Sequence, residues 1–216
     1  MKAKRQNAVA LHRGHQQGWL AQKGLPGLSL HKRLLQGVFL LLLTLTGTLQ
    51  AEEFVWAPDL PVGSAFPPVN AVDQDGKAHS FTDLRGDKGL VLVMSRSFDW
   101  CPYCIRQLQQ LVEVRTQFEA LGFHVATMTY DSVATLKEAE DEYGTDFPLL
   151  HDEGSAHIKA MGILNTQYEP GHRAYGIPYP GIFVIDHTGV IRAKLAEEDY
   201  RLRPDFSLVL EAINAL

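Results

Sequence analysis

The sequence predicts an α/β fold in which helices flank both faces of a central mixed β-sheet. The apolar run Leu90–Met94 is uninterrupted, which is typical of a strand buried on both faces. From Cys101 to Leu121, apolar residues recur at spacings of three and four, which indicates an amphipathic helix. The strands expected at 182–185 and 190–195 flank the turn Asp186–Gly189, so they form an antiparallel hairpin. Alternation of strands with helices, followed by a hairpin, leaves few ways to wind such a sheet.

The remaining elements follow from turn residues, helix caps and shorter periodic stretches. They are, in chain order, a short hairpin of 69–72 with 78–81, a strand at 123–128, a helix at 132–143 capped by Asp131 or Ser132, an extended segment at 148–150, a short helix at 155–161, and a final helix from Pro204 to Leu216. Residues 162–179 show no periodicity and form the one long loop, a kind of segment that often carries function.

The first 51 residues have the layout of a secretory signal peptide. They hold seven basic residues and no acid, and the apolar run 34–49 ends shortly before Ala51. That run is 16 residues long, which is shorter than the ~20 residues of a comfortable membrane span. We expect cleavage after Ala51 and one folded domain at 52–216, in the periplasm or otherwise outside the cytoplasm. An uncleaved N-terminal membrane tether is the alternative.

Charge and cysteine content narrow the function classes. All 25 acids lie from Glu52 onward beside 13 basic residues, so that part of the chain carries a formal charge of 13 − 25 = −12. Such a charge argues against nucleic acid as a partner, because phosphate contacts require clustered Lys and Arg. The chain has two cysteines, close together, and a domain of this size needs no disulfide to fold. The pair therefore points to chemistry.

Cys101 and Cys104 are the candidate catalytic residues, in the stretch Trp100-Cys101-Pro102-Tyr103-Cys104 at a strand-to-helix boundary. A thiolate at a helix N-terminus faces unpaired N–H groups, which lower its pKa. We therefore expect Cys101 to attack a substrate disulfide and Cys104 to resolve the mixed disulfide. A structural disulfide and a zinc site are weaker alternatives, and haem attachment would require His where Ile105 stands. The sequence calls for no cofactor and no metal.

At these residues the chain resembles the thioredoxin superfamily, and more narrowly the redoxin group that includes the AhpC/TSA peroxiredoxins. The resemblance spans about Val62 to Val190. Besides Cys101 it rests on Asp83–Gly86, Phe147–Asp152 and Phe183–Asp186. It implies a thioredoxin-like fold and redox chemistry at the cysteine pair.

The chain also departs from the peroxiredoxin pattern. Peroxiredoxins of this group hold peroxide with a Thr three residues before the reactive Cys and an Arg three residues before the Phe of the late strand. Phe98 and Pro180 occupy those positions here. Pro180 matches instead the cis-Pro that packs beside the dithiol of thioredoxins. Trp100 resembles the Trp that shapes the thioredoxin substrate surface, whereas Ser95 replaces the buried Asp of thioredoxins.

We assign no catalytic role to the other ionisable residues considered as candidates. Arg96 and Asp99 flank the motif; we expect them to be solvated loop charges, and tuning of the thiolate by either one is the alternative. His151, His157 and His172 are expected at the surface and not as metal ligands.

These features predict an exported thiol–disulfide oxidoreductase. Its partners would be protein or small-molecule thiols and disulfides, with a membrane-bound thiol reductase as a candidate electron donor. The first alternative is an antioxidant peroxidase of the AhpC/TSA family, in which Cys101 forms a sulfenic acid and Cys104 resolves it. The second is a copper-handling protein of the Sco type, for which His172 is the candidate third ligand.

Overall fold

The computed structural model describes residues 54–216. The expected signal peptide or tether at 1–51 lies outside the described residues, so it stays a prediction. Within 54–216, no helix combines the length and apolar character that crossing a membrane requires.

A seven-stranded mixed sheet forms the centre of the fold, in the order β2-β1-β5-β4-β3-β6-β7. Strand β3 (Gly89–Met94) runs parallel to β4 (Phe123–Thr129), which runs parallel to β5 (Leu149–His151). Strand β6 (Gly181–Asp186) pairs antiparallel with β3 and forms the expected hairpin with β7 (Ile191–Leu195). The predicted mixed α/β sheet is thus confirmed.

The early hairpin is also present, but it ends sooner than the sequence predicts. Strands β1 (Asn70–Val72) and β2 (Ala78–Ser80) pair antiparallel. Phe81, expected in the second strand, instead opens the short helix α2 (Phe81–Leu84). The reason is a capping box: the Ser80 hydroxyl accepts from the Asp83 N–H, and the Asp83 carboxylate accepts from the Ser80 N–H at 2.8 Å.

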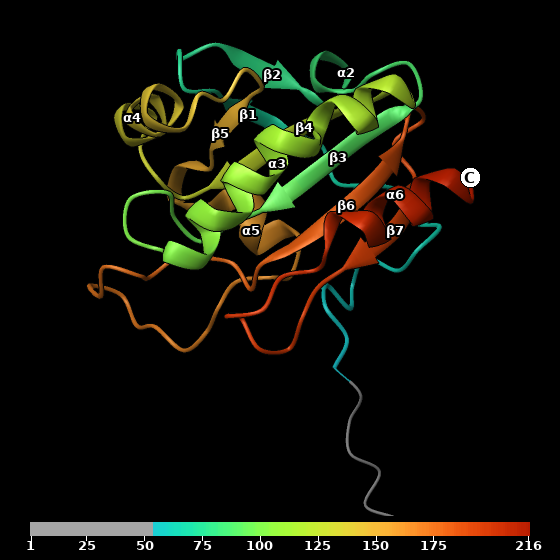
Figure 1. Cartoon of the computed structure of the whole chain (residues 1–216). Helices are drawn as coiled ribbons and strands as arrows, with labels where there is room; N and C mark the ends of the chain where they lie inside the picture. Colours follow the sequence, from blue (N-terminus) through green and yellow to red (C-terminus); the bar gives the residue numbers. More distant parts are fainter. Residues whose placement is uncertain (1–53) are drawn as a thin grey trace, which may run out of the picture. The chain divides into compact units, whose positions relative to one another are not determined.

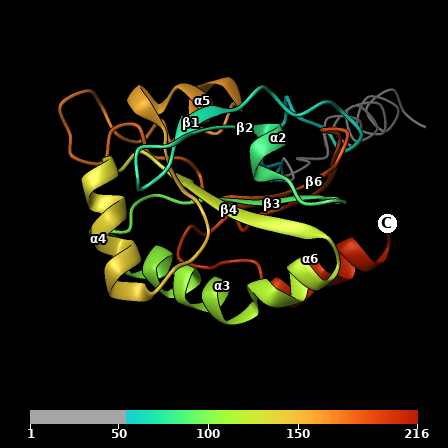
Figure 2. The same cartoon turned by 90° about the horizontal axis from the view of Figure 1, so that it is seen from above.

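Helices cover both faces of the sheet (Figures 1 and 2). One face packs against α3 (Pro102–Ala120), α4 (Val133–Tyr143) and α6 (Phe206–Asn214), and the other against α2, α5 (Ala156–Ala160) and the segment that precedes β1. A short 3₁₀ turn, η1 (Glu153–Ser155), leads into α5. Alternate residues of β3 enter the two core clusters, which confirms the expected burial of this strand on both faces.

The end of the sheet where β3 points is where the long connections meet. The dithiol motif joins β3 to α3 there, and Figure 1 shows the 162–180 loop and the 196–205 loop at the same end. Residues 162–180 hold no helix or strand, as predicted, and a single bridge of Leu164 to Pro178 closes their base. The topology therefore brings three distant segments around the cysteine pair.

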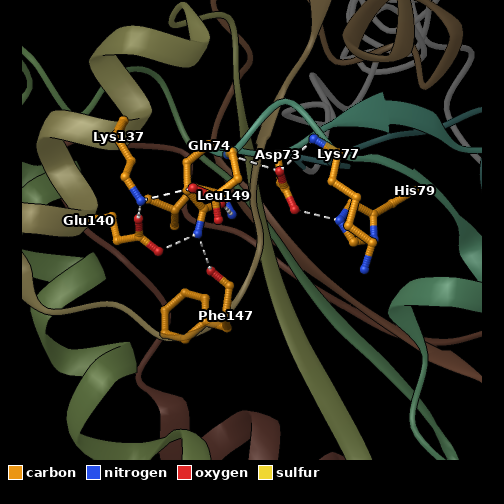
Figure 3. A network of polar contacts seen from close by, with 9 residues as sticks. Asp73, Gln74, Lys77, His79, Lys137, Glu140, Phe147 and Leu149 are labelled. Atoms are coloured by element: carbon orange, nitrogen blue, oxygen red, sulfur yellow. Dashed lines mark hydrogen bonds and ion pairs between the residues drawn. The ribbon is translucent and has the colours of Figure 1, made fainter.

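A buried polar network fastens the early hairpin to the rest of the sheet (Figure 3). Gln74 is buried, and its amide donates to Glu140 (2.8 Å) and to the Phe147 carbonyl (3.3 Å). Its amide oxygen accepts from the Leu149 N–H at 2.8 Å. One side chain thus connects the β1–β2 turn to α4 and to the strand β5.

We expect Gln74→Ala to lower the free energy of unfolding by about 1–3 kcal/mol, because buried backbone groups at Phe147 and Leu149 lose their partner. Urea unfolding of the purified protein measures the change, with an unaltered m value. Gln110→Ala, on the exposed face of α3, is the matched control and should have little effect. Equal stabilities of the two variants would contradict the role given to Gln74.

Candidate functional site

The cysteine pair lies at the start of α3, as the sequence predicts. Cys101 is the N-cap residue with φ −99° and ψ 99°, and Pro102 occupies the first helical turn. The Cys101 carbonyl accepts from the N–H groups of Cys104 and Ile105, both at 3.0 Å. Both cysteines are free thiols and are buried, with 1% of Cys101 and none of Cys104 exposed. The sulfurs therefore lie in a site that is nearly closed to water.

Arg203 reaches the inner sulfur from the 196–205 loop. Its Nη2 donates to Cys104 Sγ at 3.3 Å. Its Nη1 donates to the carbonyls of Tyr200 and Leu202, the latter at 2.7 Å, so the guanidinium is held in place by backbone of its own loop. A fixed positive charge at this distance stabilises a thiolate on Cys104.

The two thiols differ in pKa. The hydrogen bond from Cys101 to Cys104, followed by burial, raises the pKa of Cys101. Burial alone would raise the pKa of Cys104, but that hydrogen bond and the Arg203 charge lower it to about 6. The sequence predicts the lowered pKa at Cys101; in the dithiol it falls on Cys104 instead, because that sulfur accepts the hydrogen bond from Cys101 and contacts the Arg203 guanidinium. Because the two thiols are coupled, the first deprotonation step is a property of the pair.

Trp100 is tied to the long loop beside the motif. Its Nε1 donates to the Tyr130 hydroxyl at 3.0 Å, and that hydroxyl donates to the Arg173 carbonyl at 2.7 Å. The Arg173 guanidinium lies 5.0 Å from the centre of the indole ring. The half-buried ring packs against the core cluster that contains Cys101, and its role in shaping a substrate surface stays a prediction.

Arg96 is not the solvated loop charge that the sequence predicts. It is 5% exposed, and its guanidinium lies between the rings of Trp100 (5.2 Å) and Tyr200 (4.3 Å). Its Nη2 also donates to the Tyr168 hydroxyl at 3.3 Å. Burial follows because Trp100 of the same loop and two aromatic side chains from distant loops, Tyr168 and Tyr200, surround it. Asp99, in contrast, is exposed as expected.

A buried carboxylate lies beneath the motif loop, although Ser95 leaves the thioredoxin position without one. Asp131, at the end of β4, accepts from the Phe98 N–H at 2.7 Å. Burial raises the pKa of Asp131, and this hydrogen bond opposes the effect. The Ser97 hydroxyl meanwhile accepts from the N–H groups of Asp99 and Trp100. These contacts fix the backbone that leads into Cys101.

Pro180 lies at the same end of the sheet as the cysteine pair. It is buried and directly precedes Gly181, which pairs with Met94 at the end of β3. The Tyr179 carbonyl before it accepts from Trp56 Nε1 at 2.9 Å. Trp56 also packs so closely that a Cβ on Gly181 would lie 2.5 Å from its ring, which explains the glycine. The cis form of the Tyr179–Pro180 bond stays a prediction.

The histidines have structural surroundings. His157, expected at the surface, is half-buried because its Nδ1 donates to the fully buried Asp152 (2.8 Å) and its Nε2 accepts from the Asn70 N–H (3.1 Å). His151 donates to the Asp131 carbonyl at 2.7 Å. His172 is exposed and stacks on Tyr168 with ring centres 4.8 Å apart. Within residues 54–216, no three His, Cys, Asp or Glu side chains are grouped as metal ligands.

Several residues of the site are absent from the sequence-based prediction. Arg203, Tyr200 and Arg173 come from loops with no regular pattern, so nothing in the sequence places them near Cys101. Asp131 had a usable signal. It follows the strand predicted at 123–128, and parallel neighbouring strands end at the same edge of a sheet.

The sequence matches known redox proteins. A profile described as the AhpC/TSA family matches residues 62–194. Peroxiredoxin Q, chloroplastic, from Oryza sativa subsp. japonica is 30% identical over 132 residues, which cover 60% of this chain and 56% of that protein. The chain thus spans little more than half the length of this plant relative. The thiol-disulfide oxidoreductase ResA of Geobacillus thermodenitrificans is 27% identical over 170 residues, covering 76% of this chain and 88% of that protein.

Solved structures agree on the fold. The peroxidoxin BcpB of Mycobacterium tuberculosis matches with a TM-score of 0.62 and 18% identity, over 73% of this chain and 98% of that one. The thiol peroxidase of Chromobacterium violaceum matches with a TM-score of 0.60 and 21% identity, over 76% and 97%. At such identities the likeness establishes the thioredoxin-like fold alone. With the family profile covering well over half of its residues, the chain belongs to the AhpC/TSA family and is a thioredoxin-like redox protein.

Proposed function

We propose that this protein is an exported thiol–disulfide oxidoreductase whose working group is the Cys101–Cys104 pair. The observation that carries the proposal is the guanidinium of Arg203 at 3.3 Å from Cys104 Sγ. A cation on the second cysteine favours the steps in which that sulfur carries negative charge, namely resolution of a mixed disulfide and departure from an intramolecular one. Both are steps of dithiol–disulfide exchange.

In the reducing direction, Cys101 transfers its proton to the Cys104 thiolate through their hydrogen bond and attacks one sulfur of the substrate disulfide. The substrate S–S bond breaks, and its other sulfur leaves as a thiolate. That thiolate takes the proton from Cys104, which then attacks Cys101 Sγ and releases the second substrate thiolate. The protein ends as the Cys101–Cys104 disulfide, and two electrons have passed to the substrate.

Access to Cys101 requires local opening. With 1% of this residue exposed, no substrate sulfur reaches it along the resting surface. The segment that leads into Cys101 is a loop, and Arg203, which contacts Cys104, lies on another; loops move more easily than core strands. We infer that local movement of the backbone around Cys101 admits the substrate sulfur.

A thiol peroxidase is the second candidate, supported by the similarity to peroxiredoxin Q and to a thiol peroxidase. Two features of the site weigh against it. The positions at which the peroxiredoxin pattern places Thr and Arg carry the buried residues Phe98 and Pro180, and neither side chain can donate a hydrogen bond to peroxide. The cation that contacts the pair lies on Cys104 and not on the sulfur that peroxide would oxidise.

We expect the protein to turn over a disulfide substrate and to consume hydrogen peroxide negligibly. Cys101→Ser should abolish disulfide exchange, because the attacking sulfur is gone. Cys104→Ser should accumulate a mixed disulfide with the substrate, visible by mass spectrometry, because the resolving sulfur is gone. Fast peroxide consumption that is lost in Cys101→Ser would instead assign the protein to the peroxidases.

We expect Arg203→Gln to raise the pKa of Cys104 from about 6 by about one unit, the size of a hydrogen bond to a charged group. Thiolate absorbance at 240 nm against pH, recorded on the reduced protein, measures it. Arg201→Gln is the matched control, since that exposed arginine pairs with Asp199 and makes no contact with sulfur. An unchanged titration in Arg203→Gln would remove the guanidinium from the proposed mechanism.

Export rests on the N-terminal segment alone. We expect expression of the full chain in a bacterium to place the domain outside the cytoplasm, with processing after Ala51. Cell fractionation and the intact mass of the purified protein check both points. Recovery of the full-length chain in the membrane fraction would establish the tether and make a membrane-bound thiol reductase the nearer partner. Recovery of the full-length chain in the cytoplasm would contradict export.

A further inference from the structure

Three arginine and three aromatic side chains contact one another in one continuous row beside the cysteine motif. The Arg106 guanidinium lies 5.7 Å from the Tyr103 ring, and the Tyr103 and Tyr200 rings meet edge to face at 6.2 Å. Arg96 then lies between Tyr200 (4.3 Å) and Trp100 (5.2 Å), and Arg173 lies 5.0 Å beyond Trp100. We call these six residues the arginine–aromatic row. It draws on α3, the 196–205 loop, the motif loop and the 162–180 loop.

The outer members of the row are open to a partner. Arg106 and Arg173 are exposed, and Tyr200 is 39% exposed. A guanidinium that stacks on a ring uses its face, so its in-plane N–H groups remain free for a carboxylate. Within residues 54–216, the arginines that form ion pairs are Arg115, Arg192 and Arg201, none of which belongs to the row.

The row stands out from the rest of a strongly acidic domain. The chain from Glu52 onward carries a formal charge of −12, yet the three arginines of the row have no carboxylate of this domain to balance them. The exposed acids nearest to row members in sequence are Asp99, Glu169 and Glu198, none of which pairs with an arginine of the row, and Asp199, next to Tyr200, is held by Arg201. An acidic partner would therefore be attracted to the row, while the net negative charge of the rest of the domain would repel it.

The composition of the row favours a polypeptide over a small molecule. Tyr, Trp and Arg are the residues that contribute most often to protein–protein binding energy, and Lys, which is depleted at such interfaces, is absent from the row. Its members Trp100 and Tyr103 lie on either side of Cys101 in the chain, and the row extends from α3 to the 162–180 loop. A bound chain would thus place its own cysteine near Cys101 and residues on both sides of it against the row.

We propose that the arginine–aromatic row is the docking surface for a polypeptide whose redox-active cysteine is flanked by Asp or Glu side chains. The inference rests on the proposed function for the identity of the reacting group. Exposed carboxylates of the partner would pair with Arg106 and Arg173, and the buried Arg96 would add charge from beneath. Recognition of this kind is sensitive to salt, because the outer pairs are open to water.

A pair of fluorescent peptides tests the docking surface separately from the chemistry. Both peptides carry Ser at the position of the redox-active cysteine. In one peptide Glu residues flank this Ser, and in the other Gln residues flank it. Fluorescence polarisation should give a Kd for the Glu peptide about tenfold below that of the Gln peptide at low salt, the sum of two or three exposed ion pairs. The difference should vanish in 0.5 M NaCl.

Variants then locate the effect. Arg106→Gln and Arg173→Gln should each weaken binding of the Glu peptide about threefold. Lys77→Gln, which removes the same charge from an exposed residue of the β1–β2 hairpin, should leave the Kd unchanged. Equal affinity for the two peptides would overturn the inference. The same holds if both arginine variants bind the Glu peptide as tightly as the unsubstituted protein does. Binding of glutathione disulfide in preference to the Glu peptide would also overturn it.

The turnover of bis(2-hydroxyethyl) disulfide, an uncharged small substrate, is measured in parallel. Its absence would contradict the proposed function, whereas the peptide affinities would still decide whether the row binds acidic polypeptides. The two failures are therefore distinguishable.

Discussion

Two sulfurs that water barely reaches must have their negative charge balanced by the protein itself. In this site the balance comes from Arg203, whose guanidinium contacts Cys104 and is held by two carbonyls of its own loop. Without a fixed cation, burial would disfavour the thiolate on Cys104 more strongly, since charge in a closed site is costly. The loop between β7 and α6 is thus as much a part of the reactive centre as the helix that carries the cysteines.

The rest of the fold brings such loops together. Because β3 and β4 are parallel, their carboxyl ends meet at one edge, which places Asp131 beneath the motif. Because β6 runs antiparallel to β3, it begins at that same edge, which places Pro180 there. The aromatic side chains then close the site by stacking on Arg96. A buried sheet whose loops meet at one end suits a centre that must open to admit a substrate sulfur and close around it afterwards.

Apolar runs, periodicity and turn residues sufficed to predict the sheet, the long helix after Cys101 and the late hairpin, because these signals are local. The prediction misses the short helix α2, because it places Phe81 in a strand although Ser80 and Asp83 form a capping box there. Arg96 and Arg203 could not be placed, since a charged residue in a loop is buried only by partners far away in sequence. For the same reason the sequence points to the wrong cysteine for the lowered pKa. Arg203, which helps to lower the pKa of Cys104, lies 99 residues away from it along the chain.

The reduction potential of the Cys101–Cys104 pair, measured by equilibration with glutathione buffers, is the most direct test of the claim that Arg203 sets its reactivity. A guanidinium that stabilises the thiolate stabilises the reduced protein, so its loss should make the pair more reducing. Arg203→Gln should therefore shift the potential by about 20 mV to more negative values at pH 7. A potential equal to that of the unsubstituted protein, or more positive, would contradict the claim.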